Sequence, residues 1–294
     1  MKQKLFLAVL TFAAVLCYGK SKTETKTSNM AITESDRLSF KSYSDVNGLR
    51  MYYEIYGAGK PLVLIHGGGS TIQTNFGRVI PQLAKNHRLI AVELQAHGRT
   101  DDRESEVSFE QDADDVAILL KNLNIPKADF FGFSNGGTTA LQIAIRHPKL
   151  VDKIIAASAL CKRSGVPSQF WAFMAQAKLE NMPEPLKEAY IQVASDPDQL
   201  QVMHDKDARR MVNFKDIPDE KIKSIDAPTL IVIGDKDVIT PEHAVEMNRL
   251  IPNSRLAIIP GGHGEYMGEI TTLKPDSNES DFLIIPMIEN FLEE

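Results

Sequence analysis

Cysteine is nearly absent from this sequence of 294 residues, which contains only Cys17 and Cys161. A disulfide framework is therefore excluded as a source of stability, because loss of a leader that includes Cys17 would leave Cys161 alone. Cys161 follows the apolar segment IIAASAL, a setting that favours a small core residue over a catalytic thiol. The chain must gain its stability from burial of an apolar core.

An excess of basic residues is also lacking. The net charge is -6 and the pI is about 5.7, so the sequence offers no overall positive surface for a phosphate backbone. Nucleic acid is therefore not an expected partner. Apolar residues make up 43% of the chain and charged residues 24%, which are ordinary values for a globular protein.

The chain has no long hydrophobic run. Residues 5–16 are apolar but too few to cross a bilayer, so no stable membrane span is predicted. Lys2 and Lys4 precede this run and Gly19 follows it, a pattern typical of a signal peptide over residues 1–19. We expect export, to the periplasm or out of the cell. Lipoprotein anchoring at Cys17 is the alternative, disfavoured by the bulky Leu16.

The rest of the chain reads as one large α/β domain with an insertion. Residues 20–37 are polar and predict a flexible tether, and the alternating segment after residue 38 predicts a hairpin that turns at Asn47-Gly48. Short apolar runs then alternate with helical patterns, which predicts a mostly parallel sheet flanked by helices. We assign the core to residues 38–161 and 227–294.

Residues 162–226 interrupt this alternation and predict an inserted helical cap without strands. The cap holds the only tryptophan, Trp171, and four of the ten methionines, Met174, Met182, Met203 and Met211. Two interpretations stand for these side chains. They line an adaptable apolar substrate pocket, or they pack the cap helices on the sheet.

The segment DFFGFSNGG places Ser134 between glycines at the junction of a predicted strand and a predicted helix. The GFSNG pattern matches the nucleophile elbow, in which a sharp turn exposes a serine hydroxyl. Glycines beside it let the incoming strand and the outgoing helix approach closely, while the serine itself takes a strained conformation. Ser134 is the predicted nucleophile.

A serine nucleophile needs a base and an orienting carboxylate, which in this architecture follow it in the order acid, then histidine. His263 lies among glycines after the last predicted strand. Asp235 and Asp237 follow the preceding strand, and we favour Asp237 because a loop must carry the carboxylate toward the histidine. His66 and His97 precede the serine and are predicted to brace their glycine-containing turns.

The segment LVLIHGGGS supplies glycines directly after a strand, where backbone amides can approach a substrate. The amides of Gly68 and Asn135 are the predicted oxyanion hole. A phosphate-binding loop is the rival interpretation, but no GKS or GKT follows this segment and GxGxxG is absent, so no nucleotide cofactor is expected. We predict neither a cofactor nor a metal.

In the order HGGG (66–69), ELQAHGRT (93–100), GFSNGG (132–137), GDKD (234–237) and GGHG (261–264), these motifs resemble the α/β-hydrolase superfamily across residues 38–294. The resemblance implies an eight-stranded, mostly parallel sheet and a cap after the sixth strand, as in the branch of lactonases, esterases and carbon-carbon bond hydrolases. The chain departs from the family's aspartate-led DxxGxGxS loop, with Glu93, Ala96 and Thr100 at its positions.

The predicted function is hydrolysis of a small carboxylic ester or lactone through an acyl-enzyme on Ser134. Carbon-carbon bond hydrolysis and cofactor-free perhydrolysis use the same side chains and stay open, as does a ligand-binding module without catalysis. Serine in place of the aspartate nucleophile of similar enzymes argues against haloalkane dehalogenase and epoxide hydrolase chemistry. The expected partner is a small acyl substrate, and the oligomeric state is not predicted.

Overall fold

The computed structural model of the chain describes residues 38–273, 282 and 284–294. The predicted signal peptide, Cys17 and the predicted tether lie outside these residues. Within them, eight strands form one sheet. The strands are β1 (Leu38–Val46), β2 (Leu49–Tyr56), β3 (Lys60–Ile65), β4 (His87–Val92), β5 (Ala128–Phe133), β6 (Val151–Ala157), β7 (Thr229–Gly234) and β8 (Ser254–Ile259).

The sheet has the order β1-β2-β4-β3-β5-β6-β7-β8, in which β1 and β2 pair antiparallel and β2 meets β4 antiparallel. All other neighbours are parallel. The predicted hairpin is confirmed, since Val46 pairs with Leu49 around Asn47 and Gly48, whose φ angles are 48° and 77°. The fold class predicted from the sequence is therefore confirmed.

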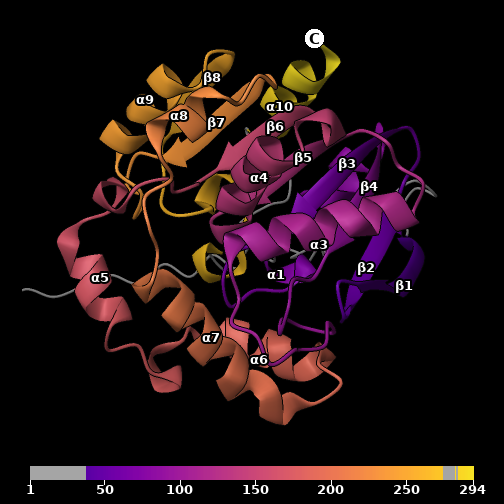
Figure 1. Cartoon of the computed structure of the whole chain (residues 1–294), viewed down its shortest axis with the longest axis vertical. Helices are drawn as coiled ribbons and strands as arrows, with labels where there is room; N and C mark the ends of the chain where they lie inside the picture. The colour runs from indigo at the N-terminus through magenta and orange to yellow at the C-terminus, as the bar shows by residue number, and fades with distance from the viewer. Residues whose placement is uncertain (1–37, 274–281, 283) are drawn as a thin grey trace, which may run out of the picture. The chain divides into compact units, whose positions relative to one another are not determined.

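Helices cover both faces of this sheet (Figure 1). The helices of the described residues are α1 (Ile72–Phe76), α2 (Ile80–Leu83), α3 (Phe109–Asn122), α4 (Asn135–Arg146), α5 (Ser168–Met174), α6 (Glu184–Val193), α7 (Leu200–Val212), α8 (Asp219–Lys223), α9 (Pro241–Leu250) and α10 (Ile284–Glu293). Among these residues, no helix combines the length and the hydropathy that crossing a membrane requires.

Alternation along the strands divides the core into two apolar clusters. Val63 and Phe130 face α3, α4 and α9, while their neighbours Leu62 and Phe131 face α1, α2 and α10. A strand presents successive side chains to opposite faces, so runs without polar alternation are buried on both sides. Cys161 is fully buried and free, as predicted for a core residue.

Between β6 and β7 the chain is helical without a strand, and α5, α6 and α7 lie together beyond the end of the sheet (Figure 1). The last helix of this stretch, α8, buries Ile222 in the cluster of α4 and α9. Trp171 stacks on Phe214 with ring centroids 5.9 Å apart and packs against the same cluster. This tryptophan therefore serves packing.

The turn from β5 into α4 depends on two glycines. A methyl group on Gly136 would overlap the carbonyl oxygens of Ile65 and His66, and one on Gly132 would overlap the backbone of Gly136. The backbone of α4 therefore touches that of β3 directly. No residue with a side chain fits at Gly136 without moving one of these elements.

We predict that Gly136→Ala lowers the free energy of unfolding by about 3 kcal/mol, because the added methyl group forces β3 and α4 apart. Urea denaturation measures the change. Gly262→Ala is the matched control, since a methyl group there would come within 4 Å only of Glu265, at 3.8 Å. Equal stability of the two variants would contradict the prediction.

Candidate active site

Ser134 stands at the apex of the turn between β5 and α4. Its backbone has φ 54° and ψ -119°, a conformation that residues with side chains seldom adopt. The amide of Ser134 donates to the carbonyl of Ala157 at 2.8 Å, which ties the turn to β6. The turn holds the hydroxyl at the wall of a cavity.

The structure brings Ser134, His263 and Asp237 together in one hydrogen-bonded chain. Ser134 Oγ lies 3.0 Å from His263 Nε2, and His263 Nδ1 lies 2.7 Å from Asp237 Oδ1. A carboxylate accepts only, so Nδ1 carries the proton and Nε2 is left to accept from the serine. The imidazole is thus oriented as a base toward the hydroxyl.

Asp235, the other candidate carboxylate, does not reach His263. It is exposed, and its Oδ1 accepts a hydrogen bond from the amide of Gly261 at 2.8 Å. This contact supports the loop that carries His263. Asp237 therefore binds the imidazole of His263, and Asp235 binds the backbone of the loop that carries it.

The side chain of Asp237 is fully buried and remains ionised because its oxygens accept hydrogen bonds from several donors. Burial alone would raise its pKa, but His263, the hydroxyl of Ser158 and the amide of Ile239 together lower it. Ser158 Oγ donates to Asp237 Oδ2 at 2.5 Å, and the amide of Ile239 donates to Oδ1 at 3.0 Å. Both oxygens are therefore held.

Ser158 is in turn held by Tyr266. The two hydroxyls lie 2.7 Å apart, and because Ser158 gives its proton to Asp237, Tyr266 is the donor between them. Burial raises the pKa of Tyr266 well above its usual range, so its proton stays in place. Neither residue is marked by a sequence motif, and a φ of 48° at Ser158 is visible only in the structure.

The predicted oxyanion donors, Gly68 and Asn135, line the same cavity as Ser134. Within the part of the chain that the structure describes, neither amide donates to another protein group. Asn135 is the first residue of α4, where helical amides lack partners and the helix dipole favours a negative charge. Both amides are thus available to a ligand.

Residues 66–70, here called the glycine loop, are held from the core by two side chains. His66 Nδ1 donates to the carbonyl of Gly67 at 2.7 Å, and Asn75 accepts from the amide of Gly67 at 2.7 Å. A trans peptide directs its N–H opposite to its C=O, so the amide of Gly68 is directed away from His66. His66 therefore sets the direction of a candidate oxyanion donor.

His66 performs this role as a neutral imidazole. Burial, reinforced by repulsion from His97, lowers its pKa to about 3. Its second nitrogen, Nε2, accepts from the amide of Leu94 at 3.0 Å, which leaves the proton on Nδ1. The sequence predicted that His66 braces its turn, and in the structure His66 forms one hydrogen bond to the backbone of its own turn and one to the backbone of Leu94.

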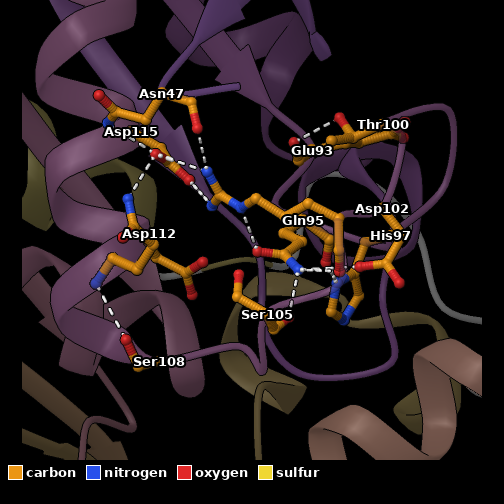
Figure 2. Close-up of polar contacts among 12 residues, drawn as sticks. Asn47, Glu93, Gln95, His97, Thr100, Asp102, Ser105, Ser108, Asp112 and Asp115 are labelled. Atoms are coloured by element: carbon orange, nitrogen blue, oxygen red, sulfur yellow. Dashed lines mark hydrogen bonds and ion pairs between the residues drawn. The ribbon is translucent and has the colours of Figure 1, made fainter. Parts of the chain in front are cut away.

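His97 belongs to the loop after β4, whose polar side chains bond to one another, to the loop backbone and to Asp115 of α3 (Figure 2). Gln95 donates to Asp102 at 2.8 Å and to the carbonyl of Ser105 at 2.9 Å, and Thr100 donates to the carbonyl of Glu93 at 2.6 Å. Glu93 is buried against Arg99, with atoms 2.8 Å apart. Glu93 and Thr100, which depart from the family pattern, thus form hydrogen bonds and an ion pair within this loop.

A buried chain of charges joins this loop to the cap helix α7. His97 Nε2 lies 2.9 Å from Asp207 Oδ2, Asp207 also binds Arg210, and Arg210 reaches Asp112 of α3 at 2.7 Å. Beside it, Lys206 binds Asp102 at 2.6 Å. These residues are missed by sequence reasoning, which places charged side chains of a helix in solvent.

The cavity above Ser134 has a volume of about 420 Å³ and is lined mainly by apolar side chains of the cap. Met174, Met182, Met203 and Met211 all line it. The four methionines therefore line a cavity and also pack in or against the apolar clusters, whereas Trp171 packs without lining the cavity. Among the described residues, no group of three metal-binding side chains gathers in a ligating arrangement.

A family model for the alpha/beta hydrolase fold matches residues 60–215, more than half of the chain. The chain therefore belongs to the α/β-hydrolase family and is a hydrolase of this fold. The human (Homo sapiens) serine hydrolase BPHL is 30% identical over 252 residues, which cover 79% of this chain and 84% of that enzyme. The resemblance inferred from the motifs is confirmed.

Other relatives differ in their chemistry. A 2-hydroxymuconate semialdehyde hydrolase of Pseudomonas sp. (strain CF600) is 38% identical over 112 residues, which cover 37% of this chain and 39% of that enzyme. The structure of an enol-lactonase from Burkholderia xenovorans LB400 superposes with a TM-score of 0.66 at 21% identity, over 86% of this chain and 100% of that one. At this identity the superposition shows the shared fold alone.

We predict that Ser158→Ala lowers the free energy of unfolding by about 2 kcal/mol at pH 7, because a buried carboxylate loses a donor. The pKa of Asp237 is lowered in the folded state, so its hydrogen bonds stabilise the protein above the unfolded-state pKa of about 3.9. That contribution disappears as the pH falls through the folded-state pKa.

Denaturation of both proteins between pH 3 and pH 7 measures the effect, and the difference between them should shrink below about pH 4. Tyr266→Phe is the control, because it spares the bond from Ser158 to Asp237. A difference between wild type and Ser158→Ala that does not vary with pH would refute the prediction.

Proposed function

We propose that this chain is a serine hydrolase of small, uncharged carboxylic esters or lactones. The observation that supports it most directly is the hydrogen-bonded chain from Ser134 through His263 to Asp237. Ser134 lines an apolar cavity, and the amides of Gly68 and Asn135 lie at the same cavity. Hydroxyl, base and carboxylate in this order are the parts that nucleophilic acyl transfer requires.

In the proposed mechanism, Ser134 Oγ attacks the carbonyl carbon of the substrate while its proton passes to His263 Nε2. The carbonyl oxygen becomes an anion, which the amides of Gly68 and Asn135 stabilise. His263 then gives its proton to the departing alcohol oxygen. Asp237 stays ionised throughout and favours the imidazolium.

The second half of the reaction uses the same groups. His263 accepts a proton from a water molecule, and the resulting hydroxide attacks the acyl carbon on Ser134. Collapse of the second tetrahedral intermediate releases the carboxylic acid and returns the proton to the serine. The apolar cap shields the intermediate from other nucleophiles and strengthens the electrostatic contacts around it.

Carbon-carbon bond hydrolysis is the second candidate, favoured by the similarity to the muconate semialdehyde hydrolase. The compound in that name carries a carboxylate, which a buried pocket must pair with a cation. Among the described residues that line the cavity, Lys178 is the one lysine or arginine, and it is exposed at the rim. The charge of the cavity therefore supports an uncharged substrate.

We predict that a fluorophosphonate probe labels the wild type and not Ser134→Ala, and that this variant loses ester hydrolysis while staying folded. Asp237→Asn should lose roughly 10⁴-fold in kcat, because the amide favours the wrong tautomer of the imidazole. Asp235→Asn is the matched control and should keep kcat within about threefold, since Asp235 contacts only backbone.

Folded protein that takes up no probe would instead indicate a ligand-binding module. Hydrolysis that persists in Ser134→Ala would remove the serine from the reaction altogether.

We predict that 4-nitrophenyl pentanoate is hydrolysed with a kcat/KM at least about 100-fold above that of the 4-nitrophenyl hemisuccinate ester, which places a carboxylate in the cavity. Initial rates of nitrophenol release measure both constants. Lys178→Met tests whether the rim lysine contributes, and we expect the same ratio in this variant. A preference for the charged ester would favour the carbon-carbon bond hydrolase.

A further inference from the structure

One carboxylate of the cap reaches the glycine loop directly. Asp207 in α7 accepts a hydrogen bond from the amide of Gly69 at 2.6 Å through Oδ2. The same oxygen lies 2.9 Å from His97 Nε2, and the other oxygen accepts from Arg210. Only 12% of this side chain is exposed. A buried charge of the cap is thus bonded to the backbone beside Gly68.

This bond fixes one of the two peptide planes that meet at Gly68. The plane between Gly68 and Gly69 contains the amide that Asp207 holds, because a peptide group is planar. The plane between Gly67 and Gly68 is held from the core by His66. Glycine has little conformational preference of its own, so these two contacts set its dihedral angles.

The space around Gly68 is equally restricted. A methyl group on it would lie 2.6 Å from Asn135 Nδ2 and 3.0 Å from Asp207 Oδ2. The glycine is therefore packed between the start of α4, which follows the nucleophile, and the carboxylate of the cap. Movement of Asp207 away from the core would open one side of this packing.

The charge on Asp207 is matched to its surroundings. Burial alone would raise its pKa, but Arg210 and His97 lower it below its usual range. His97 Nδ1 lies 2.8 Å from the carbonyl of Gln95, and its Nε2 lies 2.9 Å from Asp207 Oδ2 and 3.2 Å from the amide nitrogen of Gly69. Burial opposes a charge on the ring, but Asp207 raises the pKa of His97 above its usual value, which favours a proton on both nitrogens. An amide at position 207 keeps one accepting oxygen, so its NH₂ group would face either Arg210 or the pair of donors from Gly69 and His97.

We propose that Asp207 is a positioning residue for the oxyanion hole, through which seating of the cap on the core holds the amide of Gly68 in its catalytic orientation. The inference rests on the proposed function, since it concerns the amide that would stabilise the anion. Asp207 itself does not touch the reacting atoms. Its effect is transmitted through one hydrogen bond to Gly69.

The test compares Asp207→Asn with wild type in ester hydrolysis and in binding of a trifluoromethyl ketone. The hydroxyl of Ser134 adds to this ketone, its proton passes to His263, and the ketone oxygen becomes an anion in the hole. We expect kcat to fall about 10- to 100-fold, with KM changed less than about threefold. Affinity for the ketone should fall by the same factor as kcat.

Two controls lie on the same helix. Arg209→Gln removes an exposed ion pair with Glu106 and should leave all constants unchanged. Lys206→Gln weakens the seating of α7 on Asp102 without contact to the glycine loop, and should alter KM more than kcat. Wild-type ketone affinity in Asp207→Asn, or an equal loss in Arg209→Gln, would overturn the inference.

A readout without turnover separates this inference from the proposed function. Hydrogen exchange of the peptide that covers residues 66–70, followed by mass spectrometry, should be faster in Asp207→Asn and unchanged in Arg209→Gln. If the wild type hydrolyses no ester, the proposed function fails, and the exchange rates still decide whether Asp207 holds the loop. Equal exchange in wild type and Asp207→Asn would refute it.

Asp207→Glu covers the case in which the asparagine variant does not fold. It keeps the charge near Arg210 and His97 but displaces the oxygens by one methylene group. We expect a folded protein with a reduced kcat and a reduced ketone affinity. A glutamate variant with wild-type kcat would show that the position of the carboxylate does not matter, and would also overturn the inference.

Discussion

Direct contact between two stretches of backbone sets the geometry of this site. Gly136 lies against the carbonyls of Ile65 and His66, so the start of α4 and the start of the glycine loop cannot move independently. Ser134 precedes Gly136 by two residues, and Gly68, whose amide is a candidate oxyanion donor, follows His66 by two. This close approach is possible only because Gly136 has no side chain. It therefore positions the hydroxyl of Ser134 and the amide of Gly68 as precisely as the side chains of the close-packed core are positioned.

Around this contact, the polar side chains of the site form a series in which each residue holds the next by a hydrogen bond. Asp237 orients His263, Ser158 holds Asp237, and Tyr266 holds Ser158. Buried charges of this kind add little net stability, because desolvation offsets most of their attraction, but a misplaced partner is costly. Such buried charges therefore contribute mainly by favouring one arrangement of the site over others. The same reasoning applies to Asp207, whose several partners leave few arrangements in which its charge is satisfied.

Much of this could be predicted from the sequence, because the relevant signals are local. Turn chemistry at Asn47-Gly48, unbroken apolar runs and the glycines around Ser134 each depend on a few neighbouring residues. The sheet order and Asp207 could not be predicted in this way. In α7, the buried residues Met203, Lys206, Asp207 and Arg210 share one helical face, yet three of them are charged. This charged face can be buried only because residues distant in the sequence, such as Asp112 and Asp102, form ion pairs with it.

The four thioethers around the cavity have a chemical consequence. Unbranched, polarisable side chains can change rotamer and so alter the shape of the cavity without any backbone movement. The same sulfur atoms are open to peroxide. A sulfoxide at Met182, whose Cε would lie 3.1 Å from a methyl group on Gly69, would put a strong dipole close to the glycine loop. The conformational freedom of these side chains and their susceptibility to oxidation thus have one origin, the thioether group.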